Sequence, residues 1–326
     1  MLNYKKMPKV ELHLHLDGSV RPETAAKLLG IDIAEARKNM IADDKCLDLN
    51  DYLTKFFIPG EVMQTKKNLE LISEELAADL EEDGVIYAEI RFAPLKHVFK
   101  GLSLDEVVES VLKGLAKKSL KTNLILCMMR GDKEEDNIKV VDLAERFLNR
   151  GVVALDLAGA ESIYKTIDYK NLFAYAKGKN IPFTIHAGEA DGKDRMKAAI
   201  DFGAKRLGHG VNAIFHKEIL EEIRQKDILL EICPTSNVQT NVIKDIKYHP
   251  VRKLYDANIL VSINTDNNTV SNVTLTTEYE KLAQKLNFTY KDFVKMNKDA
   301  IRHAFISEDE KEQLLQKYDA KLNQLS

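Results

Sequence analysis

The chain has 326 residues, of which 44% are hydrophobic and 30% are charged, and its formal net charge is -3. This length suits one large globular domain over residues 1–326, and the near-neutral charge without a basic stripe argues against a nucleic-acid partner. The 3 cysteines lie far apart, which argues against a disulfide framework, and no apolar run approaches the length of a membrane span. We therefore expect a soluble cytoplasmic protein with no membrane partner.

Short apolar runs alternate with longer charged amphipathic stretches along the chain. Eight runs are predicted to be strands: 9–17, 84–94, 122–130, 152–159, 182–189, 205–211, 228–234 and 259–266. The segments between them have helical patterns, such as the one after Ser103, which has capping-box spacing to Glu106. Strands separated by helices imply parallel βαβ units, and eight of them predict an α/β fold of the closed (β/α)8 TIM-barrel type. A doubly wound open sheet is the alternative architecture.

Two regions exceed a minimal barrel. Residues 18–83 separate the first two predicted strands and contain helical patterns at 21–30, 51–57 and 65–82. An insertion after the first strand would lie over the carboxyl-terminal mouth of the barrel, where substrates enter. Residues 275–326 are predicted to form additional C-terminal helices, one of them capped by Ser307 and Glu310.

The first predicted strand contains the motif HLHLDG at 13–18. Strand side chains alternate between two faces, so this strand has an apolar face and a polar face. The apolar face holds Val10, Leu12, Leu14 and Leu16, and the polar face holds Glu11, His13, His15 and Asp17. Taken alone, the motif allows either a polar face turned to water or the start of a metal site inside a barrel.

Polar groups at the ends of later strands favour the metal site. His186 and Glu189 end the fifth strand, His209 ends the sixth, and Asp266 ends the eighth. Each histidine alone would more often be a hydrogen-bonded core residue, but the carboxyl ends of barrel strands meet at one mouth. Three imidazoles and a carboxylate suit zinc. The predicted metal ligands are His13, His15, His186 and Asp266.

The remaining histidines do not follow strands in this way. His97, His216, His249 and His303 fall in loop or helical contexts, and we interpret them as structural or solvent-facing. Cys233 follows an apolar strand, which is typical of a packed thiol.

Six motifs occur in a specific order: HLHLDGS, VVALDLAGAE, TIHAGE, RLGHG, CPTSN and NTDN. This ordered set, from residue 9 to at least 270, strongly resembles the adenosine deaminase family of metal-dependent hydrolases. The resemblance implies a (β/α)8 barrel with one catalytic Zn2+ per chain. It also implies hydrolysis of the 6-amino group of adenosine or 2′-deoxyadenosine, a reaction of purine salvage. The implied partners are a small-molecule purine nucleoside and water, and the sequence assigns no oligomeric state.

Carried over position by position, the resemblance assigns roles to individual residues. The zinc ligands would be His13, His15, His186 and Asp266. Glu189 would donate a proton, and His209 would orient the attacking water or help deprotonate it. His15, Asp17 and Gly159 would contact the substrate, with Asp17 at the ribose and the backbone N–H of Gly159 at purine N3.

The chain departs from the family at one position. After Asp266, the best-known form of the family has a second aspartate that contacts purine N7, whereas this chain has Asn267. N7 is an acceptor, and a carboxyl can donate to it only when protonated, while an amide donates in its neutral form. We therefore predict that Asn267 keeps the N7 contact and that Asn267→Ala lowers kcat/KM substantially.

The predicted chemistry explains why these residue types are needed. Replacing an aromatic amino group by oxygen requires a strong nucleophile, and zinc can lower the pKa of bound water to about 7. Attack at C6 pushes electron density onto N1, where a buried carboxylic acid such as Glu189 can deliver a proton. A cysteine-ligated base deaminase does not fit, because the isolated cysteines cannot supply a P-C-x-x-C motif.

Two rival functions stay open on the sequence. One is deamination of a related aminopurine, namely adenine, AMP or a modified nucleoside. The other is a catalytically silent barrel that only binds purines.

Overall fold

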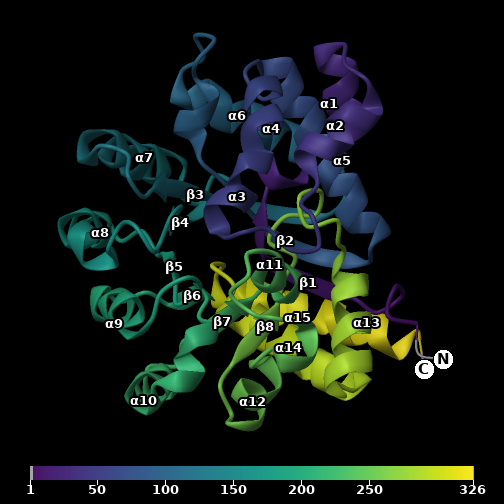
Figure 1. Cartoon of the computed structure of the whole chain (residues 1–326), viewed down its shortest axis with the longest axis vertical. Helices are drawn as coiled ribbons and strands as arrows, with labels where there is room; N and C mark the ends of the chain where they lie inside the picture. Colours follow the sequence, from purple (N-terminus) through teal and green to yellow (C-terminus); the bar gives the residue numbers. More distant parts are fainter. Residues whose placement is uncertain (1–2, 326) are drawn as a thin grey trace.

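Eight parallel strands form the centre of the computed structural model, which describes residues 3–325 apart from the side chain of Asn50 (Figure 1). The strands are β1 (Lys9–His15), β2 (Val85–Phe92), β3 (Lys121–Met129), β4 (Val152–Ala158), β5 (Thr184–Ala187), β6 (Arg206–His209), β7 (Leu229–Ile232) and β8 (Val261–Ile263). Each overlaps one predicted strand, so the predicted order of strands is confirmed. The later strands are shorter than predicted, and the chain turns directly after β5 and β6 through the positive φ angles of Gly188 and Gly210.

The strands close into a barrel through two seams. Ladders pair β1 to β4 in order and β5 to β8 in order. The N–H of Leu155 on β4 donates to the carbonyl of Pro182 before β5, at 3.0 Å. At the other seam, the N–H of Asp266 donates to the carbonyl of His13 at 2.9 Å, and the N–H of His15 donates to the carbonyl of Asp266 at 2.7 Å. The barrel prediction is therefore confirmed over the open-sheet alternative.

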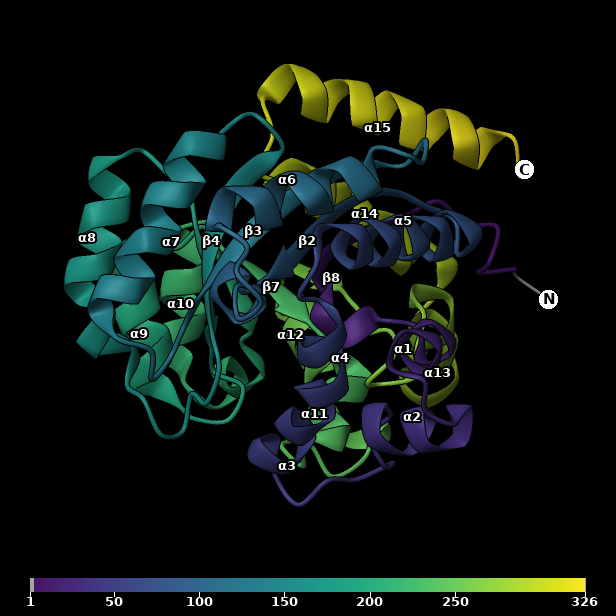
Figure 2. The ribbon, with the colours of Figure 1, turned by 90° about the horizontal axis from the view of Figure 1, so that it is seen from above.

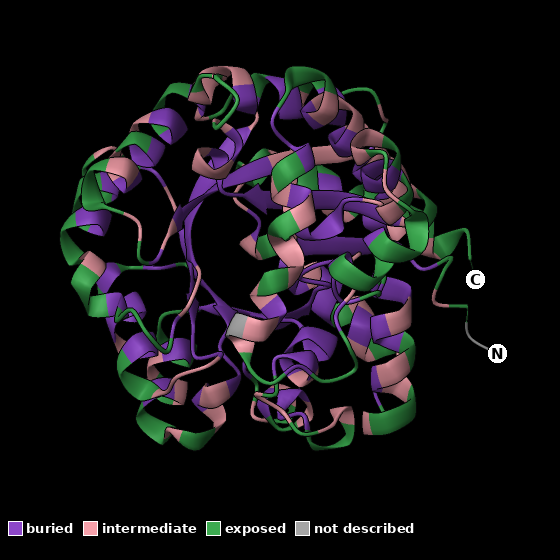
Figure 3. Cartoon of the chain, turned by 45° about the horizontal axis from the view of Figure 1, so that its top comes forward, coloured by how far each residue is buried: buried purple, intermediate pink, exposed green. Residues whose placement is uncertain are grey.

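A layer of helices covers the outside of the strands, with buried faces turned inward and exposed faces turned outward (Figure 3). In chain order these are α6 (Leu104–Leu115), α7 (Glu134–Phe147), α8 (Lys170–Gly178), α9 (Lys193–Phe202), α10 (Lys217–Gln225) and α12 (Val251–Asp256). The short helix α11 (Pro234–Gln239) follows β7 directly. The predicted capping box of α6 is present, because Ser103 and Glu106 each bond the other's backbone. Val107 and Val111, one turn apart, are buried against the barrel.

The segment between β1 and β2 divides into two parts. It contains α1 (Pro22–Leu29), α2 (Ile33–Met40), α3 (Leu49–Leu53), α4 (Phe57–Val62) and α5 (Lys66–Glu82). Helix α5 packs against α6 and β2 and so belongs to the outer layer of the barrel. Helices α3 and α4 supply residues to a cavity at the mouth. The part over the mouth is thus shorter than the predicted range 18–83.

The C-terminal helices α13 (Leu275–Leu286), α14 (Tyr290–His303) and α15 (Glu308–Asn323) occupy the region predicted for them. Helix α14 packs on β1 and β8 and completes the outer layer. Helix α15 begins at the predicted Ser307–Glu310 capping box and lies on the side opposite α3 and α11 (Figure 2). Among the described helices, none combines the length and apolar character needed to cross a bilayer.

Candidate metal and active site

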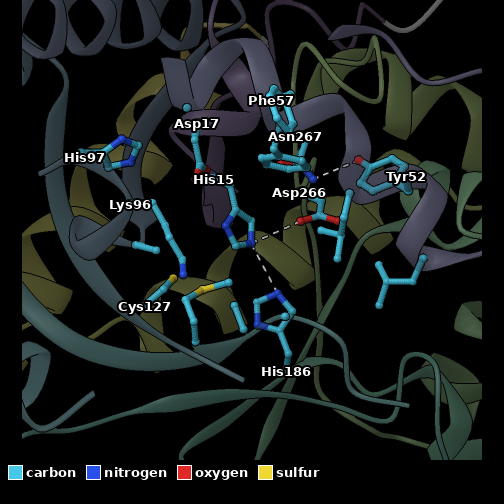
Figure 4. Close-up of a pocket in the computed structure, with 18 of the residues that line it drawn as sticks. His15, Asp17, Tyr52, Phe57, Lys96, His97, Cys127, His186, Asp266 and Asn267 are labelled. Carbon is cyan, nitrogen blue, oxygen red and sulfur yellow. Dashed lines mark hydrogen bonds and ion pairs between the residues drawn. The ribbon is translucent and has the colours of Figure 1, made fainter. Parts of the chain in front are cut away.

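Three imidazoles and one carboxylate meet at the mouth of the barrel. Figure 4 labels three of these four side chains, those of His15, His186 and Asp266. His13 and His15 lie on β1, His186 lies on β5, and Asp266 follows β8. One ligand atom from each of the four lies within 4.8 Å of the others. His15 Nε2 is 3.4 Å from His186 Nε2, and Asp266 Oδ1 is 3.4 Å from His13 Nε2 and 3.5 Å from His15 Nε2. An edge of a zinc tetrahedron with bonds of about 2.0–2.1 Å is roughly 3.3 Å, so this spacing fits one ion.

The protonation of these rings also fits a cation at the centre. His13 Nε2 is buried and has no hydrogen-bond partner within residues 3–325, and such an atom is costly unless a ligand reaches it. Burial lowers the pKa of His15 and of His186, which favours the neutral rings that bind metals. For His13, burial lowers the pKa, but the carboxylates of Asp266 and Glu231 outweigh it and the net shift is upward.

Buried carboxylates hold the outer nitrogens of two of these rings. Glu231 Oε2 on β7 accepts from His13 Nδ1 at 2.8 Å, and Asp156 Oδ2 on β4 lies 2.8 Å from His186 Nδ1. Arg91 on β2 joins the two carboxylates, with Nη1 2.8 Å from Asp156 and Nη2 2.8 Å from Glu231. The side chains of Arg91, Asp156 and Glu231 have no exposed surface. A carboxylate on Nδ1 leaves Nε2 as the free ligand atom and fixes the ring orientation.

Glu189 and His209 lie beside the cluster. Glu189 Oε2 is 3.5 Å from His209 Nε2, and both side chains are buried. Burial, reinforced by the charge of Asp266, raises the pKa of Glu189 well above its usual value, which favours the protonated form of this carboxyl. Glu161 anchors the loop that carries it, accepting from the backbone N–H groups of residues 188–190 at 2.6 to 3.0 Å.

A cavity of about 750 Å³ lies over the cluster, and the other predicted substrate-binding residues line it. Asp17 lies in a short 3-10 turn (Asp17–Ser19), Gly159 comes directly after β4, and Asn267 follows Asp266. Gly159 has a φ of 102°, a backbone conformation that side chains disfavour. Burial raises the pKa of Asp17 to about 6.

Asn267 is held by a residue of the segment over the mouth. Its Nδ2 donates to the hydroxyl of Tyr52 on α3 at 3.0 Å, and that hydroxyl is 2.7 Å from Ser271 Oγ. Asn267 Oδ1 is packed over Gly18, where a Cβ atom would come within 1.7 Å of it. One N–H of the Asn267 amide is thus taken by Tyr52, and a second remains for an acceptor in the cavity.

Two of the remaining histidines are buried. His97 lines the cavity at 1% exposure, and His249 is 3% exposed and bonded to Asn237. Of the two roles predicted for these histidines, structural or solvent-facing, the structural role is the one that applies to His97 and His249. Cys233 is the expected packed thiol, with Sγ 3.6 Å from the carbonyl of Glu231.

A second group of possible metal ligands combines Cys233 with His209, His13 and Asp266. It shares His13 and Asp266 with the first group, so the two groups cannot each hold a separate metal ion at the same time.

Sequence reasoning missed the residues that support the ligands. These are Arg91, Asp156, Glu161 and Glu231, together with Tyr52 and Asn237. A signal was available for three of them, since Arg91, Asp156 and Glu231 are charged residues inside otherwise apolar strands. Charged residues are almost never fully buried unless paired, so they must meet one another inside the barrel.

The closed barrel and the ligand cluster at its mouth are those of the metal-dependent (β/α)8 hydrolases. Residues 8–321 match the family described as adenosine deaminase, and the chain belongs to this family. It is 40% identical to the adenosine deaminase of Enterococcus faecalis, and the match covers 97% of each chain.

Solved structures share the fold closely. The N6-mAMP deaminase of Arabidopsis is 27% identical, with a TM-score of 0.88 over 97% of this chain and 99% of that one. An amidohydrolase of Burkholderia ambifaria with bound zinc has a TM-score of 0.88 at 20% identity, over 99% of this chain and 93% of that one. At 20% identity, the similarity to the Burkholderia ambifaria structure supports the fold of this chain and not its activity.

Proposed function

We propose that this chain hydrolyses adenosine and 2′-deoxyadenosine to inosine and 2′-deoxyinosine with release of ammonia, as a step of purine salvage. The observation that carries the proposal is the meeting of four metal-type ligands with the buried carboxyl of Glu189 at one cavity. The 40% identity to an adenosine deaminase over nearly the whole chain supports the choice of substrate. We further infer that residues 1–326 act as one cytoplasmic domain.

The proposed metal is one zinc ion per chain, held by His13, His15, His186 and Asp266. Zinc, when bound, lowers the pKa of water to about 7 and so makes a nucleophile available at neutral pH. Three imidazole nitrogens and one carboxylate oxygen at tetrahedral-edge spacing favour zinc over the oxygen-preferring Mg2+ or Ca2+.

The residues around the cluster divide the remaining work. Glu189, kept protonated by burial, delivers its proton to purine N1 as C6 becomes tetrahedral. His209, 3.5 Å from Glu189, faces the attacking oxygen. Asp266 Oδ2 accepts from Ser236 Oγ at 2.6 Å, which holds its other oxygen towards the histidines. Asp17 takes the ribose, and the Asn267 amide donates to N7.

A related aminopurine deaminase is the second candidate, since the Arabidopsis protein of the same fold acts on N6-mAMP. A nucleotide substrate needs a cation that is free to meet its phosphate. Lys96 lines the cavity, but its ammonium lies 2.8 Å from both carboxylate oxygens of Asp132, so its charge is already matched. Lys100 also lines the cavity and is exposed, so parallel assays with adenosine and AMP distinguish a nucleoside from a nucleotide substrate.

The test is a chelation and readdition experiment. The protein is stripped with a chelator, zinc is returned, and the loss of adenosine absorbance is followed in parallel assays with AMP and adenine. Zinc-dependent conversion of adenosine supports the proposal. Preferred conversion of AMP or adenine supports the related deaminase, and tight adenosine binding without inosine formation supports the silent purine-binding barrel.

A further inference from the structure

A chain of buried hydrogen bonds leads away from the cavity behind His209. His209 Nδ1 is 3.1 Å from Asn237 Nδ2, and Asn237 Oδ1 is 3.2 Å from His249 Nε2. The backbone N–H of Val251 then lies 3.1 Å from His249 Nδ1. Asn237 belongs to α11, and His249 precedes α12. The exposed fractions of His209, Asn237 and His249 are 1%, 0% and 3%, so water does not compete for these bonds.

The donor and the acceptor of each hydrogen bond in this series can be assigned from the end at His249 and Val251. A backbone N–H can only donate, so His249 Nδ1 accepts from Val251. Burial lowers the pKa of His249 to about 3, so the ring is neutral and its single proton is on Nε2. That proton can only be donated to Asn237 Oδ1. The Asn237 amide is thereby oriented with its NH2 group, which only donates, towards His209 Nδ1.

We propose that Asn237 and His249 are positioning residues that hold His209 as the tautomer with its proton on Nε2. Nδ1 of His209 must accept, so the ring turns an N–H towards Glu189 and the metal ligands instead of a lone pair. An imidazole in this form can hold the attacking oxygen by donating to it. It has no free lone pair with which to take the proton of that oxygen, so Nε2 does not act as a base.

The backbone supports a fixed ring at this position. His209 has a φ of 62°, a left-handed conformation that non-glycine residues adopt rarely and that persists when the surroundings impose it. Its ring centroid lies 4.8 Å from that of His13 and 5.2 Å from that of His186. The ring therefore contacts two metal-type ligands and the Asn237 amide, and these contacts restrict its orientation.

The role of His209 in catalysis rests on the proposed function, whereas the position of its ring proton does not. Histidine labelled with 15N in the zinc-loaded protein reports the tautomer directly, because a protonated and an unprotonated ring nitrogen have well-separated chemical shifts. We expect His209 Nδ1 to have the shift of an unprotonated nitrogen. A protonated Nδ1 in the unchanged protein overturns the inference, even if adenosine is deaminated. An unprotonated Nδ1 in a protein that does not deaminate adenosine overturns the proposed function alone.

Three variants sharpen the test. Asn237→Asp replaces the donor by an acceptor and should move the His209 proton to Nδ1. We expect kcat to fall by at least about tenfold, against roughly 10⁴-fold for the wrong histidine tautomer in a catalytic triad, with KM and zinc content little changed.

His249→Phe removes the donor that orients Asn237 and should allow both tautomers of His209, whereas His249→Gln keeps a donor and should restore the single tautomer. Asn241→Asp, an exposed change just after α11, is the matched control. An unchanged His209 tautomer in Asn237→Asp contradicts the proposal.

Discussion

The two walls of the cavity are built differently. Behind the strand side, Glu231 contacts the ring of His13 and Asp156 contacts the ring of His186. Arg91 joins these two carboxylates, and none of the three supporting side chains has exposed surface. On the side of the helical segment and the loop after β2, Phe57 is 85% exposed and Phe99 is 75% exposed. Large apolar groups left open to solvent suit contact with a purine more than they suit catalysis. The difference indicates that changes on the strand side act on metal binding and kcat, and that changes on the helical side act on KM.

The largest expected effect is that of Glu189→Gln on the strand side. Glutamine has nearly the same shape but no acidic proton, so kcat should fall by about 10²–10⁴-fold while zinc content is retained. Glu61→Gln is the matched control, since Glu61 also lines the cavity but lies on the helical side. Steady-state kinetics with metal analysis check both variants. Full activity of the Glu189 variant would remove it from the mechanism.

The pH dependence of kcat gives a second measurement on Glu189. Its folded-state pKa is raised by burial, and the proton donor is the acid form. The rate should therefore hold through neutral pH and fall as the pH rises through this raised pKa. In Glu189→Gln this alkaline fall should disappear from the residual rate. An alkaline fall of the same size in the variant would assign it to another group.

Asp156→Asn tests the carboxylates behind the ligands. An amide no longer provides the negative charge beside His186 Nδ1, and it weakens the pairing with Arg91. Zinc affinity, measured by competition with a chelator, should fall by about 10–100-fold. Asp201→Asn is the control, because Asp201 forms an exposed ion pair with Lys197. Equal zinc affinities in the two variants would refute the supporting role.

Asn267→Ala tests the predicted N7 contact between the two walls. Loss of one hydrogen bond to the substrate should lower kcat/KM by about tenfold, which is about 1.4 kcal/mol. A 7-deaza analogue of adenosine has a C–H at this position and accepts no bond. It should be the poorer substrate of the unchanged protein, and the Asn267→Ala variant should treat the two substrates more nearly alike. Kinetics of the variant indistinguishable from those of the unchanged protein would contradict the contact.

Tyr52→Phe is expected to have the smallest effect. It removes the hydroxyl that accepts from Asn267 Nδ2 and leaves the ring in place on α3. The amide then loses one restraint but keeps its donor, so KM should rise by roughly threefold with kcat nearly unchanged. A large loss of kcat would show that this helix contributes to the chemistry and would remove the distinction between the walls.

Much of the fold could be predicted because its signals are local. Eight apolar runs separated by helical patterns gave the order of strands, and the capping boxes at Ser103 and Ser307 gave two helix starts. Assigning residues 66–82 to the insertion was wrong, because amphipathic character does not say which surface a helix covers. The packing of α5 against α6 decides that.

The candidate site also has one part that local sequence pattern predicts and another part that it does not. Period-two alternation in β1 places His13 and His15 on one face, and strand ends at one mouth bring His186 and Asp266 near them. The partners of these groups were not predictable from local pattern. Arg91 meets Asp156 and Glu231 across the barrel, at sequence separations of 65 and 140 residues.

The amino-acid sequence by itself determined the order of the strands, the residue types at their ends and hence the kind of ion that they suit. These follow from side-chain chemistry and from a strand's fixed two-residue period. Only the tertiary structure decided which groups are buried together, how the carboxylates, Asn237 and His249 orient the rings, and which wall is open to solvent. The physical reason is that burial and hydrogen-bond direction depend on neighbours that are distant in the chain and become adjacent only when the barrel closes.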